Sequence, residues 1–482
     1  MLTAEDYGAF EVAERKTVWV AEGDSLPDDF PPFRVVKCET ERRCDGVTLI
    51  SLCNPAFHPP EKRRAPRGYI VALDRCGRVI WYLQEITMLL DFRFVDGRLT
   101  YMMNDNRLVE SDLDGEVLRQ WHAHHAWIDG VTNSLYIAPH KTLPNAEVSI
   151  AVDVKQLHHS FDFLPNGNIC ALSAEMFDVA EWYGCDVDPT KPKKPSRLAA
   201  DVIVEFTPSG YLVRSISLAD VLGTTDRIGY NSVNLMFYWL FRGFPATCDW
   251  THANSVRYSV DMDAFVLSVR HMDCVLSVNR VDHKLRWILG TPTHWDERVR
   301  AKCLVPLGDV DFPFHQHDVS IHSDGRIMVF DNGNSRAIPF QQWTPMKQCE
   351  SYVTMWQVDE VNHTVKQEFS YKKGPFSPFV SGAFLLSNGS VFATFGGIMT
   401  GMRQGTDYEE NPGACFPKNM ADDARCRFEL IEFTAAGETV FHVSCNEEED
   451  VNAGVKPVSW VSFRSEHVKV FEKTDVRTCW IF

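Results

Sequence analysis

Polar residues that could perform chemistry recur at the starts of three similar segments in the middle of the chain. They are His158-His159, then His252 followed by Asn254, and then His315-Gln316-His317-Asp318. A neutral imidazole is a nucleophile and a proton carrier near neutral pH. Imidazole, amide and guanidinium groups also donate hydrogen bonds in several directions, which suits a tetrahedral oxyanion. The pattern therefore indicates a site for an anionic ligand.

The stretch from Cys248 to Gly290 indicates how such residues could converge. Its apolar residues alternate on either side of the bend Asp261-Met262-Asp263, which predicts a β-hairpin. Side chains two positions apart on a strand share a face, so His252 and Asn254 are predicted to project together. The returning strand would bring Arg270 beside them.

Three histidines also fit a metal site, since neutral imidazole is a common ligand for zinc, copper or iron. The fixed positive charge of Arg270 opposes a cation, and the acids Asp249 and Asp273 are predicted to lie at the flanks of the group. We therefore expect no metal. A structural interpretation, in which these residues only satisfy one another at strand ends, stays open.

Long helical patterns are scarce, and short alternating runs closed by Gly, Asn and Asp recur throughout the chain. One type of hairpin is predicted six times, at Tyr69–Leu83, Arg107–Trp121, Val202–Ile216, Cys274–Leu289, Val353–Phe369 and Phe428–Val443. A second type alternates with it, at His159–Ala174, His252–Val269, His317–Asp331 and Ser381–Phe395, with weaker copies at Phe92–Met103 and before Asn54. Two hairpins make a four-stranded unit.

Six such units predict an all-β fold, a six-bladed β-propeller with long inter-strand insertions. A single large sandwich is the alternative. Residues 1–50 match neither hairpin and are predicted to form a small N-terminal extension, and residues 51–482 the propeller. The segment Val458–Phe471 is expected to close the ring by pairing with the first unit. The aromatic run at Phe237, Tyr238, Trp239 and Phe241 is predicted to be a helix packed on the propeller, with contact to a ligand as the alternative.

Composition and net charge limit the classes of partner that the protein is expected to bind. The chain has 482 residues and a formal net charge of -17, which argues against nucleic acid or an anionic membrane surface. No leader-like or membrane-spanning stretch is visible, so the compartment is unknown and we expect a cytoplasmic protein for the chain as given. Most of the 14 cysteines are expected to be reduced, with Cys38/Cys44 and Cys415/Cys426 as the spacings compatible with a disulfide.

Several motifs resemble the arylsulfate sulfotransferase (arylsulfotransferase) family of six-bladed propellers. They are D-W-x-H-x-N-S at Asp249–Ser255, S-x-R-H at Ser268–His271, W-I-L-G at Trp287–Gly290, H-H-x-x-x-F-L-P-N-G-N at His158–Asn168, and Q-H-D with V-F-D-N-G between Gln316 and Gly333. The resemblance implies transfer of a sulfuryl group from an aryl sulfate ester to a phenolic acceptor without a nucleotide sulfate donor. It also implies a ping-pong reaction through a sulfohistidine, with no cofactor.

Matched motif by motif, the resemblance makes His317 the nucleophile. His159, His252 and Arg270 match the sulfuryl-binding and acid/base residues, and Asn254 matches a substrate-binding residue. Either His159 or His252 would accept the proton of the incoming phenol. Asp318 follows His317 on a predicted strand and would point to the other face, so it receives no role.

Other functions remain open at this point. A catalytically silent propeller could bind an anionic ligand or a protein on the same face, and water could replace the phenol to give a hydrolase. A propeller oxidoreductase with a quinone cofactor lacks a supporting pattern in the sequence. The expected partners are an aryl sulfate and a phenol, with no nucleic acid and no membrane, and a homodimer stays open.

Overall fold

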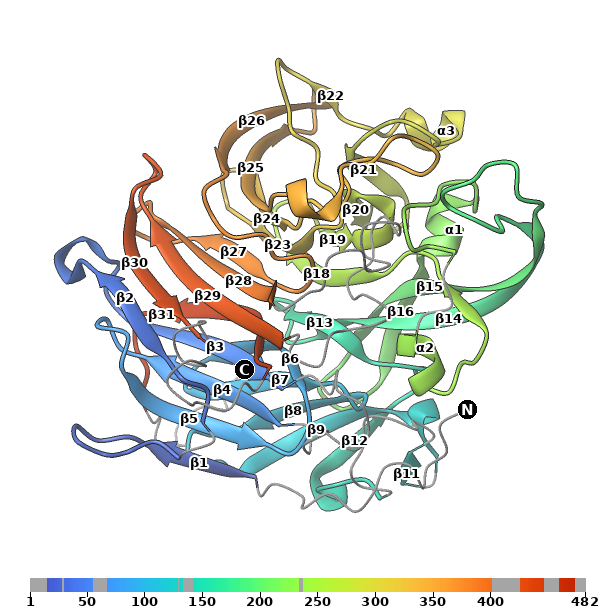
Figure 1. Cartoon of the computed structure of the whole chain (residues 1–482). Helices are drawn as coiled ribbons and strands as arrows, with labels where there is room; N and C mark the ends of the chain where they lie inside the picture. Colours follow the sequence, from blue (N-terminus) through green and yellow to red (C-terminus); the bar gives the residue numbers. More distant parts are fainter. Residues whose placement is uncertain are drawn as a thin grey trace.

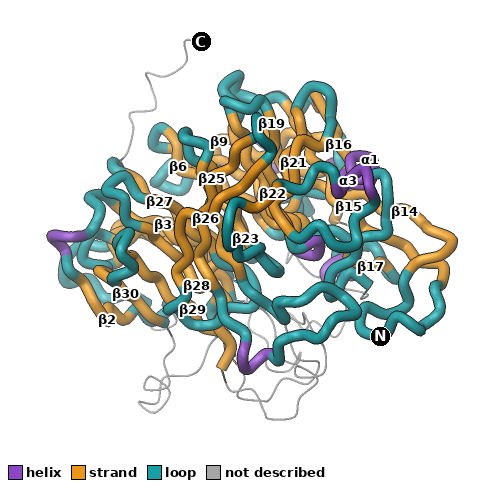
Figure 2. The backbone as a smooth tube through the Cα atoms, turned by 90° about the horizontal axis from the view of Figure 1, so that it is seen from above, coloured by secondary structure: helices purple, strands orange, loops and turns teal. Residues whose placement is uncertain are grey.

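The computed structural model describes residues 15–27, 30–54, 67–128, 130–132, 142–233, 237–400, 425–445 and 459–472. In these ranges the chain consists mainly of β-strands joined by loops and a few short helices (Figure 2). This confirms the prediction of an all-β fold. The described strands form six sheets of four or five strands and one two-stranded sheet.

The first three sheets contain the N-terminal half of the described strands and the last strand of the chain. The first sheet has the order β1 (Lys16–Trp19), β5 (Val79–Glu85), β4 (Gly68–Leu73), β3 (Val47–Cys53) and β31 (Val461–Val468). The second has the order β12 (Ser149–Val152), β9 (Val117–Ala123), β8 (Arg107–Ser111), β7 (Arg98–Met103) and β6 (Leu89–Val95). The third has the order β13 (His158–Phe163), β14 (Ile169–Trp182), β15 (Lys194–Phe206) and β16 (Leu212–Ser217), and β17 (Thr247–Asp249) also pairs with β15.

The other sheets follow in the same manner. The fourth has the order β18 (Ala253–Ser259), β19 (Ala264–Val269), β20 (Cys274–Asn279) and β21 (Leu285–Gly290). The fifth has the order β22 (Val305–Pro306), β26 (Thr364–Tyr371), β25 (Tyr352–Asp359), β24 (Arg326–Asp331) and β23 (His317–Ile321). The sixth has the order β2 (Arg34–Cys38), β30 (Thr439–Ser444), β29 (Arg425–Phe433), β28 (Val391–Thr400) and β27 (Gly382–Leu385). The two-stranded sheet pairs β10 (Trp127–Ile128) with β11 (Val131–Thr132).

With one exception, the hairpins predicted from the sequence are present. All six copies of the first type are antiparallel pairs, namely β4–β5, β8–β9, β15–β16, β20–β21, β25–β26 and β29–β30. The second type corresponds to β13–β14, β18–β19, β23–β24 and β27–β28, with the weaker copy at β6–β7. The prediction of a hairpin before Asn54 was wrong, because β3 pairs with β4 on one side and with β31, from the C-terminal part of the chain, on the other. In the other five units, two consecutive hairpins pair into one sheet.

One end strand from each of the six sheets lies next to an end strand of the neighbouring sheet. β6 contacts β13, β13 contacts β18, β18 contacts β23, and β23 contacts β27. β27 contacts β31, and β31 contacts β6 in turn. Figure 1 shows β6, β13, β18 and β23 beside one another near the middle of the molecule. We call these six end strands the inner strands.

The last strand of the chain joins the first sheet. β31 pairs antiparallel with β3, with Val47 opposite Val468 and Cys53 opposite Val461. This confirms the predicted pairing of the C-terminal segment with the first unit. Upstream of β3, β1 pairs with β5 and β2 pairs with β30 of the sixth sheet.

Apolar side chains of adjacent sheets pack against each other to form the core. One buried cluster joins Leu172 and Ile203 of the third sheet to Leu267 and Leu276 of the fourth. Full burial of a side chain of this size contributes about 1.5–3 kcal/mol. The alternation of apolar residues along each strand thus stacks the sheets face to face, which places the strand ends at one level.

Three short α-helices and five 3₁₀ turns connect the strands in the described ranges. They are α1 (Leu218–Leu222), α2 (Phe237–Phe241), α3 (Glu297–Arg300), η2 (Thr40–Arg42), η4 (His124–Ala126), η5 (Ala146–Val148), η6 (Arg270–Met272) and η7 (Met346–Gln348). The aromatic run predicted to be helical is α2, which confirms that prediction. Within the described ranges, no helix has both the length and the apolar character needed to cross a membrane.

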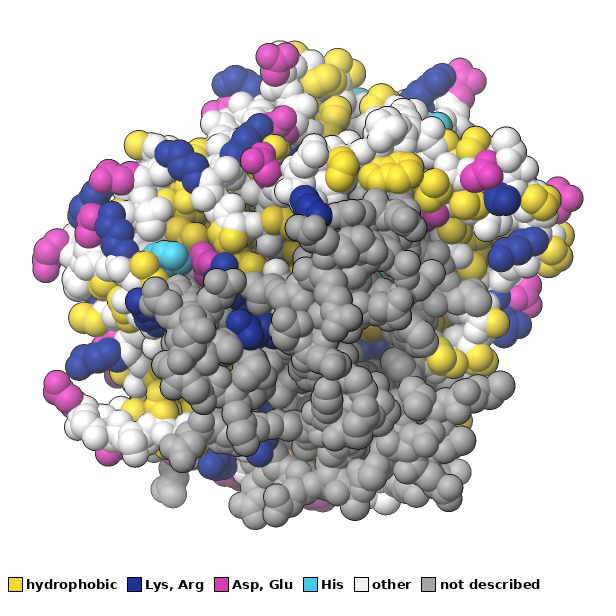
Figure 3. Space-filling model, in the orientation of Figure 1, with side chains coloured by type: hydrophobic (Ala, Val, Ile, Leu, Met, Phe, Trp, Pro, Cys, Tyr) yellow, Lys and Arg dark blue, Asp and Glu magenta, His cyan; other side chains and the backbone are white. Residues whose placement is uncertain are grey.

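The surface and the cysteines also bear on the sequence predictions. On the described part of the face in Figure 3, basic and acidic side chains are interspersed. Cys38, Cys44 and Cys426 are free, so the first two do not form a disulfide. Cys415 lies outside the described residues.

Candidate functional site

The five predicted site residues lie at the starts of inner strands or just after the hairpins that these strands begin. His159 is the second residue of β13, and His317 is the first residue of β23. His252 directly precedes β18, Asn254 lies within β18, and Arg270 begins η6 after β19. All but His252 are fully or nearly fully buried, and the His252 side chain is 11% exposed.

A β-bulge interrupts each of the three strands at this level. The register shifts between His158 and Phe161 in β13, between Ala253 and Ser255 in β18, and between His317 and Val319 in β23. A bulge bends the strand and redirects the side chains around it. Three successive sheets therefore each depart from regular pairing close to a site histidine.

The simple strand argument for His252 and Asn254 was wrong. His252 lies before the strand, with a left-handed φ of 51°, and the bulge follows at Asn254. Strict alternation of faces does not apply across such a segment. His159 has a similar φ of 54°. A non-glycine residue held in this region costs of order 1–3 kcal/mol, and such strain clusters at functional sites.

The structure brings the predicted residues into one group. The rings of His159 and His252 lie 5.1 Å apart between centroids, and His252 stacks on His271 at 4.7 Å. Burial lowers the pKa of His317 well below its ordinary value, and the charges of Arg270 and then Arg464 lower it further. His317 is therefore neutral in the folded protein, with the Arg270 charge near it.

His317 is held by an amide whose orientation is fixed. Asn332 Nδ2 donates to the backbone carbonyl oxygens of Ser377 at 2.7 Å and Val380 at 3.1 Å. Asn332 Oδ1 must then face His317 Nδ1, which lies 2.7 Å away. Since the amide oxygen can only accept, His317 Nδ1 carries the proton and donates it. The lone pair of the neutral ring is consequently on Nε2.

His159 is fixed in the same tautomer by its neighbour in sequence. His158 Nε2 donates to the carbonyl oxygen of Ser173 at 2.9 Å, and burial lowers the pKa of His158 to about 3. Neutral His158 therefore has its lone pair on Nδ1, which lies 2.8 Å from His159 Nδ1. The proton between them must belong to His159 Nδ1. Burial also holds the pKa of His159 well below its ordinary value, so its Nε2 keeps a lone pair.

His252 is held by a carboxylate. Its Nδ1 lies 2.5 Å from Asp249 Oδ2, and Trp239 Nε1 donates to Asp249 Oδ1 at 2.7 Å. Burial opposes ionisation of Asp249, but the charges of His252 and His271 and these hydrogen bonds lower its pKa below its ordinary value. The expectation that the acids lie only at the flanks was thus wrong, because the loop before β18 turns Asp249 back onto His252.

The three histidines share one arrangement. Each uses Nδ1 to bind a neighbouring side chain, and within the described ranges none of the three Nε2 atoms has a hydrogen-bond partner. None of these Nε2 atoms is among the buried polar atoms that lack a hydrogen-bond partner in the described part of the chain, so each is at least partly accessible. The arrangement leaves three Nε2 atoms, next to the buried Arg270 guanidinium, for a ligand.

The carboxylate reopens the question of a metal. Asp249, His252 and His271 offer ligand atoms that all lie within 4.8 Å of one another. The Nδ1 atoms of both histidines already bond to protein groups, since His271 Nδ1 donates to the Asp249 carbonyl oxygen at 2.5 Å and His252 Nδ1 donates to the Asp249 carboxylate. A cation bound at these two Nδ1 atoms would have to displace both protons, so the Nδ1 atoms fit a hydrogen-bonded network better than a metal centre.

Helix α2 supports the group from one side. The Tyr238 hydroxyl lies 3.2 Å from His159 Nδ1, and the Tyr238 ring lies 6.0 Å from the His252 ring. The adjacent Trp239 is 1% exposed and is the residue that bonds Asp249. The aromatic run therefore forms a helix that touches two of the predicted site residues.

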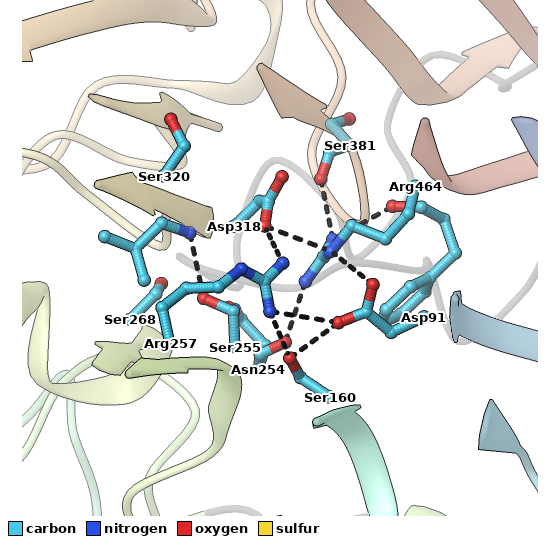
Figure 4. Close-up of polar contacts among 12 residues, drawn as sticks. Asp91, Ser160, Asn254, Ser255, Arg257, Ser268, Asp318, Ser320, Ser381 and Arg464 are labelled. Carbon is cyan, nitrogen blue, oxygen red and sulfur yellow. Dashed lines mark hydrogen bonds and ion pairs between the residues drawn. The ribbon is translucent and has the colours of Figure 1, made fainter. Parts of the chain in front are cut away.

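A cluster of buried and partly buried charges from four sheets surrounds Asn254 (Figure 4). Arg257 donates to Asp91 Oδ2 at 3.1 Å and to Asp318 Oδ1 at 2.8 Å. Arg464 lies 3.2 Å from Asp318 Oδ1 and donates to the Asn254 carbonyl oxygen at 2.8 Å. The cluster therefore holds the backbone of Asn254 and supplies both ion-pair partners of the Asp318 side chain. Asn254 itself donates to the Gln316 carbonyl oxygen at 2.8 Å.

Sequence reasoning missed several of these supporting residues. Asp249, His158 and Asn332 all lie within the quoted motifs, yet nothing in the motifs reveals which of them contacts which histidine. Arg464 lies in an ordinary strand pattern, and only the pairing of β31 with β3 places it near the site. The signal that could have found the first three is their polarity inside otherwise apolar segments.

Comparison with known proteins gives one family. The sequence model of the Arylsulfotransferase (ASST) family matches residues 35–449. The arylsulfate sulfotransferase AssT of Escherichia coli O6:H1 (strain CFT073) is 30% identical over 142 residues, which cover 26% of this chain and 23% of that protein. The arylsulfate sulfotransferase AssT of Lelliottia amnigena is 30% identical over 148 residues, which cover 27% of this chain and 24% of that protein. The chain thus matches about a quarter of the length of these relatives.

Among solved structures, a protein of unknown function from Bacteroides caccae aligns with 87% of this chain and 99% of its own, at 9% identity and a TM-score of 0.40.

Proposed function

Because this chain belongs to the arylsulfotransferase family, we propose that it transfers a sulfuryl group from an aryl sulfate ester to a phenol, without a nucleotide sulfate donor. The observation that carries the proposal is the set of three histidine Nε2 atoms that stay open beside Arg270. Such a set suits an enzyme that must bind an oxyanion, attack it and move a proton.

In the first half of the reaction, His317 Nε2 attacks the sulfur of the aryl sulfate. A bond forms between nitrogen and sulfur, and the bond from sulfur to the aryl oxygen breaks, with its electron pair going to that oxygen. Asn332 keeps the proton of His317 on Nδ1, so the attacking lone pair stands on Nε2. The products are a sulfohistidine and a phenolate, which takes its proton from His159 or His252.

Charge develops on the sulfuryl oxygens during this attack, and positively charged or donating groups would stabilise it. Arg270 supplies a fixed positive charge, whose influence on His317 is second only to burial. Asn254, held through its backbone by Arg464, is the substrate-binding residue of the proposal.

In the second half, an acceptor phenol takes the place of the first product. Its oxygen attacks the sulfur, the bond from sulfur to His317 Nε2 breaks, and the electron pair returns to His317. The phenol proton leaves to a histidine, and His159 and His252 both offer an Nε2 atom for it. All groups in this scheme are side chains, so it uses no cofactor.

The same proposal extends to the architecture. We take the six sheets as the six blades of a β-propeller, since their inner strands follow one another in a closed cycle of contacts. Residues 51–482 would form this sulfotransferase domain, and residues 1–50 an extension whose strands β1 and β2 add to the first and sixth sheets.

The test is the intact mass of the purified protein after mixing with 4-nitrophenyl sulfate. We expect a gain of about 80 Da, one sulfuryl group held covalently, which disappears when a phenol is added and does not form in His317→Ala. A protein that releases nitrophenol without gaining mass would point to direct hydrolysis. A protein that releases none across several aryl sulfates would instead support a silent propeller that binds an anion.

A further inference from the structure

The three site histidines differ in the chemistry of the group that holds Nδ1. His317 is held by the amide oxygen of Asn332, and His159 by the neutral ring of His158. His252 alone among the three is held by a carboxylate, that of Asp249. An amide or a neutral imidazole accepts a hydrogen bond without favouring a charged ring, whereas a carboxylate stabilises an imidazolium.

We propose that Asp249 is the positioning residue that makes His252 the proton carrier of the reaction, a role that neither His159 nor His317 is built to take. This inference rests on the proposed sulfuryl transfer and deepens it. His317 stays neutral as the nucleophile. His159 keeps an Nε2 lone pair that accepts a hydrogen bond and so orients the acceptor phenol.

The proton step balances in both directions. When the donor ester is cleaved, His252 Nε2 gives its proton to the departing aryl oxygen, and His252 becomes a neutral ring that still donates Nδ1–H to Asp249. When the acceptor attacks, its hydroxyl proton moves to His252 Nε2, and the imidazolium is restored next to the carboxylate. No other co-reactant is needed.

The surroundings of this pair agree with the assignment. Asp249 is fully buried and accepts from His252 and from Trp239 Nε1, so the carboxylate cannot rotate away from the ring. Asp201 is another acid whose charge interacts with His252, but it accepts hydrogen bonds from Thr251 and Ala253. The remaining titratable neighbours in the described ranges include His158, His159, His271, His317 and Tyr238. Among the described acids, Asp249 is the one that hydrogen-bonds His252 Nδ1.

The decisive experiment compares two donor esters whose leaving groups need different amounts of protonation. Phenyl sulfate releases a basic phenolate that depends on a general acid, and 4-nitrophenyl sulfate releases a weakly basic one that does not. Single-turnover rates of His317 sulfurylation are measured for wild type and Asp249→Asn with both esters. We expect a loss of about 100-fold with phenyl sulfate, the lower end of general acid catalysis, and of less than about 10-fold with 4-nitrophenyl sulfate.

Equal losses with the two esters would overturn the inference, because a merely structural defect lowers both rates by the same factor. If neither ester sulfurylates the wild-type protein, the proposed function itself fails. Should Asp249→Asn not fold, Trp239→Phe removes one hydrogen bond from Asp249 and is expected to lower the phenyl sulfate rate more than the 4-nitrophenyl sulfate rate. Equal losses of the phenyl sulfate and 4-nitrophenyl sulfate rates in that variant would again contradict the inference.

A matched control is Asp201→Asn. Asp201 is another fully buried carboxyl nearby, and it accepts from Thr251 Oγ1 and from the Ala253 backbone N–H. Burial raises its pKa to about 7, so asparagine resembles its protonated form. We expect Asp201→Asn to leave the ratio of the two ester rates unchanged. A change as large as that of Asp249→Asn would refute the specific role of Asp249.

Discussion

Replacing Asn332 with aspartate tests whether His317 acts as a neutral nucleophile. The substitution keeps the size of the side chain and puts a carboxylate oxygen where the amide oxygen now lies, 2.7 Å from His317 Nδ1. In the wild-type protein, burial and then the charges of Arg270 and Arg464 keep the pKa of His317 well below its ordinary value. The carboxylate would stabilise the imidazolium and raise this pKa.

The size of the effect follows from the strength of the new contact. A hydrogen bond to a charged group contributes about 1.5–3 kcal/mol. Since about 1.4 kcal/mol corresponds to a factor of ten, the acid dissociation constant of the His317 imidazolium falls by about 10- to 100-fold. The neutral fraction of His317 then falls by at most that factor, and only at a pH below the raised pKa. The sign is definite, because only the neutral ring attacks and raising its pKa removes the neutral form as the pH falls.

The assay is the burst of nitrophenol from 4-nitrophenyl sulfate, followed between pH 5.5 and 8. This ester is chosen because its leaving group needs little protonation. The ratio of variant to wild-type burst rates should drop toward pH 5.5 and recover toward pH 8. Asn334→Asp is the control, since Asn334 is also fully buried two residues away and hydrogen-bonds no site histidine. A ratio that stays constant with pH, or falls equally in the control, would refute the reasoning.

Three further changes probe the charges around the site. Arg270→Lys replaces a planar fork by a point charge and should lower kcat/KM for 4-nitrophenyl sulfate by about 100-fold; unchanged kinetics would exclude contact with the oxyanion. Arg464→Met leaves Asp318 with a single buried cation, and urea unfolding should show a loss of about 3–5 kcal/mol; an unaltered midpoint would contradict the structural role of the pair. Burial raises the pKa of Glu466 to about 7, so protonation of this group stabilises the folded state as the pH falls from 7. Buried histidines such as His317, which stay neutral, act in the opposite direction and destabilise the folded state below about pH 6.5. The melting temperature of Glu466→Gln should therefore fall more steeply than that of wild type from pH 7 to 5, and parallel curves would disprove the assignment.

The strand pattern could be predicted from the sequence because it depends on local information. Alternation of apolar residues and turn residues located the hairpins other than the one expected before Asn54. The same patterning extended to the pairing of Val461–Val468 with the first sheet. The left-handed backbone at His252 and His159 could not be predicted, since few non-glycine residues adopt that conformation, even though histidine is enriched among those that do. The tertiary structure imposes it, and it overturns the assumption that faces alternate.

The residues of the candidate site could be predicted from the sequence, but the hydrogen bonds that hold them could not. Residue types and repeated positions led to His159, His252, Arg270 and His317, because a chemical group must be present in the sequence to act. The partner of each Nδ1 atom depends on contacts across loops and sheets. Asn332 lies 15 residues from His317, and its amide is oriented by carbonyl oxygens of yet another loop. No spacing rule encodes such a chain of contacts.

One strand, β31, completes the first sheet and also supplies a charge beside the candidate site. β31 brings Arg464 from the end of the chain into the centre, where it binds the Asn254 carbonyl oxygen and lies beside Asp318. The charge of Arg464 also contributes to keeping His317 neutral. Without the pairing of β31 with β3, the protein would therefore lack both a fixed Asn254 backbone and part of the positive charge that keeps His317, the proposed nucleophile, neutral.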